Sequence, residues 1–113
     1  MATRYFLAIP DPASARAAGE YAFTAQGAEA LALELQEALR TGRLFERWRG
    51  AQDEPDEVDP KLAATDPSAR VEGVQRERRV ELVATTTLPG DVFKHRMRLL
   101  AGSAWELRDV RAG

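Results

Sequence analysis

Residues 79–110 constrain the fold more than any other part of the chain, because polar and apolar side chains alternate along most of this stretch. Alternation with a period of two is typical of a strand that buries one face. Two turn sequences, Pro89-Gly90 and Gly102-Ser103, divide the stretch into three parts. We therefore predict three consecutive antiparallel strands here, with the upstream residues covering one face of them.

The middle strand of the three carries the clearest alternation. Its apolar side is expected to face a covering helix, and its basic side is expected to form a stripe on the outer face of the sheet. The predicted inner residues are Phe93, His95, Met97 and Leu99, and the predicted outer residues are Lys94, Arg96 and Arg98, with Arg108 nearby.

The last hairpin admits two registers that keep the inner residues on one face. One register places Trp105 opposite Met97 and uses Gly102 in the left-handed position of a three-residue turn. The other places Asp109 opposite His95, a pairing that orients an imidazole. We favour the first register because of its turn chemistry.

The remaining elements follow from periodicity. Residues 4–9 form a first strand, with Tyr5, Leu7 and Ile9 on one face and Phe6 and Ala8 on the other. Apolar residues at spacings of three and four predict the main helix over residues 24–40, with Thr24 as its cap. A short helix is expected over 43–49, an acidic loop over 51–69 in which Asp59 and Pro60 start one helical turn, and a strand over 70–75.

These elements predict one α+β domain over residues 1–113. We expect an antiparallel sheet of four or five strands, with one main helix packed on one face and a charged opposite face. The length of 113 residues is sufficient to bury one sizeable core.

The composition excludes much chemistry. The chain has no cysteine and one histidine, which removes thiol nucleophiles, disulfides and multi-histidine metal sites. No apolar run approaches the ~18 residues of a membrane helix, and the first ten residues lack the pattern of a signal peptide, so we expect a cytoplasmic protein. We predict no cofactor and no metal site, because neither a phosphate-binding glycine loop nor a calcium-loop pattern is present.

The charge distribution is uneven. Arginine greatly outnumbers lysine and alanine is frequent, a bias that suggests a GC-rich bacterial genome. The net charge is −2 and the isoelectric point is near 5.5, which argues against binding to nucleic acid. Residues 1–69 are net acidic and residues 70–113 net basic, so the two halves complement each other within one chain or across a dimer.

Two further groups of residues are candidates for function. Arg47 and Trp48 lie in an aromatic and arginine-rich segment that either closes one end of the core or binds a partner. His95 is the only side chain that titrates near neutral pH without a large pKa shift, and Asp109 is its candidate partner. No residue is assigned a catalytic role.

The favoured function is a non-enzymatic protein-interaction or adaptor domain, with a homodimer as one form. Its possible partner-binding residues are Arg47, Trp48, Lys94, Arg96, Arg98 and Arg108. One alternative is binding of nucleic acid through the basic sheet face formed by Lys94, Arg96 and Arg98. Another is a small enzyme or ligand pocket around His95.

Overall fold

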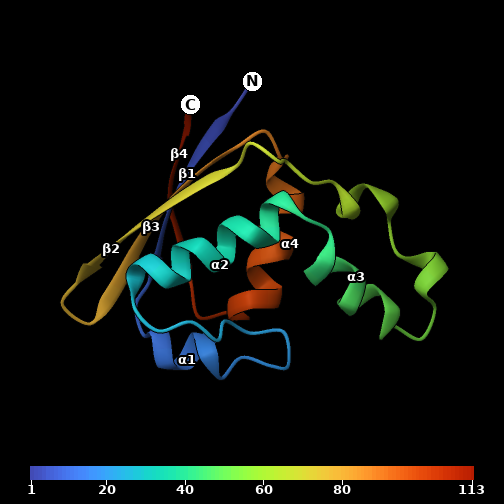
Figure 1. The fold of residues 1–113 in the computed structure, drawn as a ribbon, viewed down its shortest axis with the longest axis horizontal. Helices are drawn as coiled ribbons and strands as arrows, with labels where there is room; N and C mark the ends of the chain where they lie inside the picture. Colours follow the sequence, from blue (N-terminus) through green and yellow to red (C-terminus); the bar gives the residue numbers. More distant parts are fainter.

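The computed structural model describes residues 1–113 and is an α+β fold, with a four-stranded antiparallel sheet and several helices (Figure 1). The strands are β1 (Thr3–Ile9), β2 (Arg70–Arg76), β3 (Arg79–Thr86) and β4 (Glu106–Ala112). The α-helices are α1 (Pro12–Arg16), α2 (Ala28–Arg40), α3 (Arg43–Gly50) and α4 (Gly90–Ala101), and two short 3-10 helices are η1 (Pro55–Glu57) and η2 (Pro60–Ala63).

The strand order in the sheet is β2-β3-β1-β4, so the first strand of the chain lies between the third and the fourth. A helical connection joins β1 to β2, a tight hairpin joins β2 to β3, and α4 joins β3 to β4. This order is that of the split β-α-β arrangement of ferredoxin-like folds. Such an arrangement hosts many functions, so it does not by itself assign one.

The strand predicted over residues 70–75 is confirmed as β2, which forms a hairpin with β3. Arg76 lies opposite Arg79, so only Glu77 and Arg78 form the turn, and Glu77 takes a left-handed conformation with φ of 58°. The alternation expected at the start of residues 79–110 is also confirmed, because the residues on the inner side of β3 are buried while their neighbours are less so. The buried residues of β3 are Val80, Leu82, Ala84 and Thr86.

The prediction of a strand over residues 93–99 is wrong, because α4 occupies this stretch. The apolar residues here fit two periods at once. Phe93, His95 and Met97 alternate as in a strand, but Val92, Arg96 and Leu100 recur at helical spacing and are buried. When Arg96 is taken to be an exposed basic residue, the helical spacing of Val92, Arg96 and Leu100 is not apparent.

Neither predicted register of the last hairpin exists, because β4 pairs with β1 and not with residues 93–99. Pro89 and Gly90 begin α4 and do not form a hairpin turn. Gly102 does take a left-handed conformation, with φ of 59°, but it ends α4. The α4 crossover carries the chain past β1 to the far edge of the sheet.

The main helix is shorter than predicted. α2 begins at Ala28, and Gly27 is its N-cap residue with φ of 87°. Thr24 is therefore not a cap, and it binds the carboxylate of Glu34 instead. The predicted apolar stripe of this helix is buried as expected, and it packs mainly over β2 and β3.

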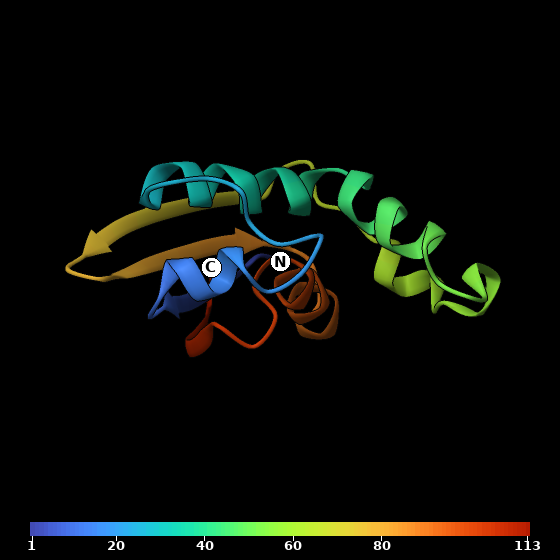
Figure 2. The same cartoon turned by 90° about the horizontal axis from the view of Figure 1, so that it is seen from below.

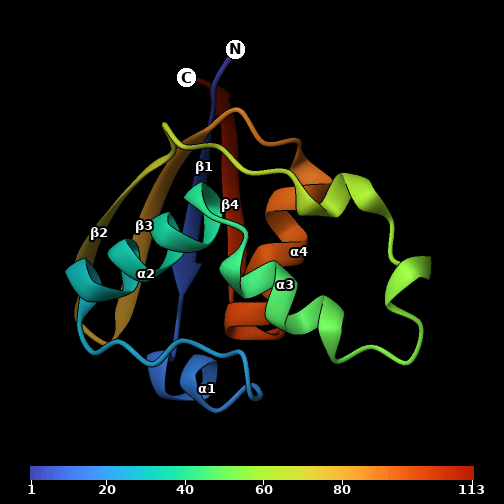
Figure 3. The ribbon, with the colours of Figure 1, turned by 45° about the vertical axis from the view of Figure 1, so that its right-hand side comes forward.

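Figure 2 shows α2 running alongside β2, and Figure 3 shows both long helices on the same face of the sheet. α2 approaches β2 closely at Gly73, where a side chain would collide with the carbonyl oxygen of Ala28. α4 covers β1, and Phe93 stacks on Tyr5 with ring centroids 4.2 Å apart. Tyr5 also donates a hydrogen bond to the carbonyl oxygen of Leu88 (3.1 Å). The prediction of one main helix thus missed the second half of the helical layer.

α3 and residues 51–63 extend from the end of α2 away from the sheet (Figure 3). The predicted short helix is confirmed as α3. The predicted helical turn in the acidic loop is also confirmed, because Asp59 accepts a hydrogen bond from the N–H of Lys61 at the start of η2.

Candidate interaction surface

The basic stripe predicted from Lys94, Arg96 and Arg98 does not lie on the sheet. All three residues belong to α4, where Lys94 is half-buried, Arg96 is fully buried and Arg98 is exposed. Residues at positions i, i+2 and i+4 share a face in a strand, but in a helix they point in different directions. These side chains therefore form no common surface for a partner.

Arg96 is a structural residue. Its Nη1 donates to the carbonyl oxygen of Ala38 (2.7 Å), and its Nη2 donates to those of Leu62 (2.9 Å) and Ala64 (2.7 Å). The guanidinium also lies 5.6 Å from the ring centroid of Phe45. Burial lowers the pKa of Arg96. The side chain joins α4 to the last turn of α2 and to η2.

His95 lies beside the aromatic residues of α3. Its ring centroid is 4.5 Å from that of Trp48 and 6.2 Å from that of Phe45, and both contacts are edge-on. The Nδ1 atom is buried without a hydrogen-bond partner. Burial, with help from the charges of Arg96 and Arg98, lowers the pKa of His95. A neutral imidazole packed against indole is consistent with a packing role.

The His95–Asp109 pair does not form. Asp109 lies on β4 opposite Phe6, and its carboxylate accepts hydrogen bonds from Arg111 Nε (2.7 Å) and from the N–H of Val110 (2.8 Å). These contacts lower the pKa of Asp109. The structure thus separates His95 from Asp109, the two residues considered from the sequence as a candidate pair.

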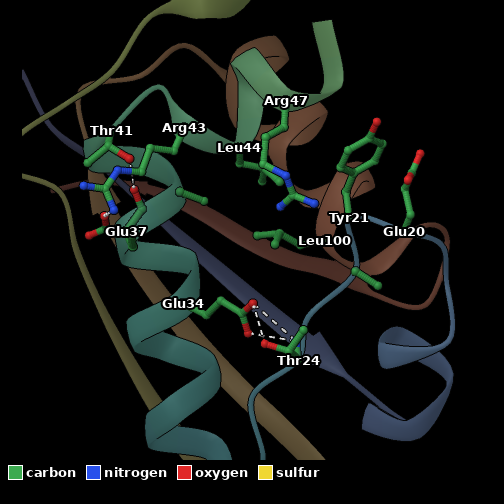
Figure 4. A pocket seen from close by; sticks show the side chains of 12 residues that line it. Glu20, Tyr21, Thr24, Glu34, Glu37, Thr41, Arg43, Leu44, Arg47 and Leu100 are labelled. Carbon is green, nitrogen blue, oxygen red and sulfur yellow. Dashed lines mark hydrogen bonds and ion pairs between the residues drawn. The ribbon is translucent and has the colours of Figure 1, made fainter. Parts of the chain in front are cut away.

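A groove of about 460 Å³ lies between α2, α3 and residues 20–24 (Figure 4). Its floor is apolar and its rim is charged. Arg47 lies over the ring of Tyr21, with 5.4 Å from the guanidinium carbon to the ring centroid. Arg43 Nη1 lies 3.9 Å from Glu37 Oε1, and both side chains are exposed. The floor residues are Ala22, Ala38, Leu44 and Leu100.

The carboxylate in the lower part of this groove is already engaged. Glu34 accepts hydrogen bonds from the N–H groups of Thr24 and Ala25, both at 3.0 Å, and so fixes the loop that precedes α2. Tyr21 has a raised pKa, caused by burial and by Glu20, and therefore remains protonated at neutral pH. The groove thus presents a concave surface with two arginines, Arg43 and Arg47, but no side chain placed to transfer a proton.

The second candidate surface is the outer face of the sheet, which we define as the side opposite α2 and α4. Phe6 lies at its centre on β1, opposite Val83 of β3 and Asp109 of β4. The guanidinium carbons of Arg4 and Arg111 lie 5.8 and 5.4 Å from the ring centroid of Phe6. A shallow hollow of about 310 Å³ lies beside this ring.

The outer face has an apolar centre and a charged surround. Phe6 and Val83 are half-buried, and Val74 on β2 is 46% exposed. Most of the surrounding charges are paired with one another. The ion pairs are Arg76–Glu81, Arg79–Glu81, Arg108–Glu106 and Arg111–Asp109. Arg4 and Arg70 face the same side without a carboxylate partner.

Of the residues singled out from the sequence, only Arg108 and Asp109 belong to the outer face. Arg47 and Trp48 lie on α3, and Arg47 lines the groove. Phe6 is the functional candidate that the sequence prediction missed, and its position on the side of β1 opposite Tyr5 and Leu7 was the signal available for it.

No three His, Asp or Glu side chains are arranged to hold a metal ion. None of the helices has the length and hydropathy that crossing a bilayer would require. Comparison of the chain with protein-family models, curated proteins and solved structures finds no match.

Proposed function

We propose that this chain is a non-enzymatic interaction domain that binds an acidic segment of a partner protein on the outer face of its sheet. The observation that carries this proposal is the position of Phe6, an aromatic ring on a central strand, on the face that no helix covers. Phe6 is half-buried among arginines. Aromatic and arginine side chains are the residues most enriched at binding hot spots.

The charges of the outer face favour an acidic partner. Arg4 and Arg70 have no carboxylate within ion-pair distance, whereas the acidic residues of this face, except Glu72, each contact an arginine. A partner carboxylate placed beside Arg4 would gain an ion pair without displacing an existing one. An apolar side chain of the partner would enter the hollow next to Phe6.

The groove of Figure 4 is less suited to an acidic segment. Three glutamates, Glu20, Glu34 and Glu37, line it and would repel the incoming carboxylates. Its apolar floor is made of small alanine and leucine side chains and holds no aromatic anchor.

Selection from a random peptide library on the immobilised protein tests the proposal. Enriched peptides are expected to carry aspartate or glutamate next to an apolar residue. Binding should fall at least ~10-fold with Phe6→Ala, in line with loss of a hot-spot aromatic. Leu33→Ala is the matched control, because Leu33 is an exposed apolar residue on α2 (62% exposed) away from the outer face. Equal loss in both variants, or no enrichment of acidic peptides, would contradict the proposal.

Single-stranded nucleic acid is the second candidate. The observation in its favour is the stacking of two arginines about the Phe6 ring, since bases stack on aromatic side chains within basic grooves. Against it, the position opposite Phe6 on β3 holds Val83 and not a second aromatic. Anisotropy of a labelled oligothymidylate at increasing salt separates the two candidates. Tight binding that weakens steeply with salt would favour nucleic acid over the acidic protein segment.

A further inference from the structure

β4 is an open edge of the sheet. It pairs with β1 on one side only, and six of its seven residues are exposed while Leu107 is half-buried. An open edge is a template for pairing with another chain. A β-bulge often protects such an edge, and β4 contains one. Whether this bulge prevents or permits pairing depends on how it arranges the side chains.

The bulge makes the facing of β4 symmetric. Leu107 lies opposite Leu7, and Asp109 lies opposite the neighbouring Phe6, so Arg108 is the extra residue between them. Leu107 and Val110 consequently face the inner side of the sheet. The flanking residues Glu106, Asp109 and Arg111 face the outer side. The order of inner-facing and outer-facing residues along β4 is therefore the same in both directions from the midpoint between residues 108 and 109.

The chemistry of β4 is symmetric about the same midpoint. When residues 106–111 are aligned antiparallel with a second copy of themselves, each acidic residue meets a basic residue and each apolar residue meets an apolar one. The resulting pairs are Glu106 with Arg111, Leu107 with Val110, and Arg108 with Asp109, each occurring twice. In a regular strand this alignment would oppose residues of different faces, and only the bulge makes it possible.

We propose that two copies of this chain pair antiparallel through β4, around a two-fold axis between residues 108 and 109. The two sheets then form one continuous sheet with twice the strands of a single chain. An interface of this kind is closed, because each copy uses the same strand. This proposal is independent of the function proposed for the outer face, which remains open in the dimer.

In the single chain, several side chains of β4 already have the exposure and the ion pairs that this contact would use. Val110 is 48% exposed, although it lies on the inner side of the sheet, and in the dimer it meets Leu107 of the second copy. Glu106 already binds Arg108 (2.9 Å), and Asp109 already binds Arg111 (2.7 Å). Pairing gives each of these carboxylates a second cation across the two strands, so four charges on each copy join one network.

The other open edge does not have this property. β2 contains no bulge, so only an alignment about one of its own residues keeps the facing. Alignment of the whole strand about its central Gly73 places Arg70 opposite Arg76 of the second copy. Like charges directly opposite are destabilising. Charge complementarity therefore selects β4 and not β2.

Charge reversals and sedimentation equilibrium test the proposal. The wild-type chain of 12.5 kDa should approach twice this mass as concentration rises from micromolar to millimolar. Glu106→Arg alone and Arg111→Glu alone should both remain monomeric, because each places like charges opposite one another twice. An equimolar mixture of these two variants should recover the dimer mass, since each Arg at position 106 or 111 then meets a Glu of the other variant.

Matched controls come from β2. Glu72→Arg and Arg70→Glu make the same charge changes at exposed positions on the opposite edge, and they should leave the dimer intact. Circular dichroism verifies that each variant is folded, and the double variant Glu106→Arg, Arg111→Glu should dimerise on its own. A wild-type monomer at all concentrations would overturn the proposal. Dimers in either single β4 variant, or no dimer in the mixture, would also overturn it.

Discussion

Replacing Arg96 by methionine removes the guanidinium while keeping most of the side-chain volume, so it isolates the three hydrogen bonds that this group donates. The acceptors differ in their surroundings. The bond to the carbonyl oxygen of Ala38 is buried, whereas those to Leu62 and Ala64 are only partly buried. Water can replace the guanidinium at the last two carbonyl groups but not at the first.

The expected loss of stability follows from this difference. One buried carbonyl group left without a donor costs about 1–3 kcal/mol. The cost of desolvating the guanidinium disappears at the same time, which offsets the loss of the two outer bonds. We therefore expect Arg96→Met to lower the free energy of unfolding by about 1–3 kcal/mol. Arg96→Ala adds a cavity and should cost about 3–5 kcal/mol.

Urea denaturation followed by circular dichroism measures these differences in the free energy of unfolding. In thermal unfolding of a chain of this length, a difference of 1 kcal/mol corresponds to about 4 °C in Tm. Arg98→Met is the matched control, because Arg98 is exposed on the same helix and its loss should cost no more than about 0.5 kcal/mol. If Arg96→Met were as stable as the wild type, the carbonyl contacts would not be the reason for burying this arginine.

Three further predictions concern other buried groups. Gly73→Ala should destabilise the protein by about 1–3 kcal/mol, because its Cβ would collide with the first carbonyl oxygen of α2, while Gly19→Ala meets open space and serves as the control in the same denaturation assay. Asp66→Ala should cost about 2–3 kcal/mol in that assay, because the carboxylate accepts hydrogen bonds from Thr86 Oγ1 (2.8 Å) and two backbone N–H groups; an unchanged midpoint would contradict this. Burial lowers the pKa of His95 below its ordinary value of 6.5, so the unfolded chain binds the proton more readily, and stability should fall as the pH drops below that value. Thermal unfolding of His95→Gln should lack this fall, and an identical pH dependence in the variant would refute the assignment.

The sheet was predictable where side chains alternate clearly and the two paired strands are adjacent in sequence. Val80, Leu82 and Ala84 alternate with polar residues along a hairpin whose two strands are adjacent in sequence, so the pattern fixed the facing correctly. The position of β4 was not predictable in this way. Its partner is β1, about 100 residues away, and no local turn signal encodes that pairing.

α4 shows why one period was mistaken for another. A half-buried strand and an amphipathic helix both place apolar residues at positions 93 and 97, and the residue that distinguishes them here is Arg96. A strand exposes this arginine and a helix buries it. Burial of an arginine depends on carbonyl groups that α2 and η2 supply from distant parts of the chain, which a local pattern does not contain. The stop signal at Gly102 was the local clue in favour of the helix.

The candidate surface was missed for a related reason. Lys94 and Arg98 are charged and therefore stand out in the sequence as candidates for a binding surface, but both lie on α4 and not on the sheet. The structure places an aromatic residue, Phe6, at the centre of the open face, and it brings Arg4 and Arg111 together from opposite ends of the chain. Only the pairing of β1 with β4 creates this arrangement.

Mapping a bound peptide on the protein by NMR tests the proposed interaction face most directly. An acidic peptide from the library selection is titrated into isotope-labelled protein, and amide shifts are followed residue by residue. The largest shifts should occur at Phe6, Val83 and Arg111, while Tyr21 and Leu44 in the groove of Figure 4 remain unchanged. Shifts confined to Tyr21 and Leu44, with Phe6 unaffected, would contradict the assignment of the outer face as the binding surface.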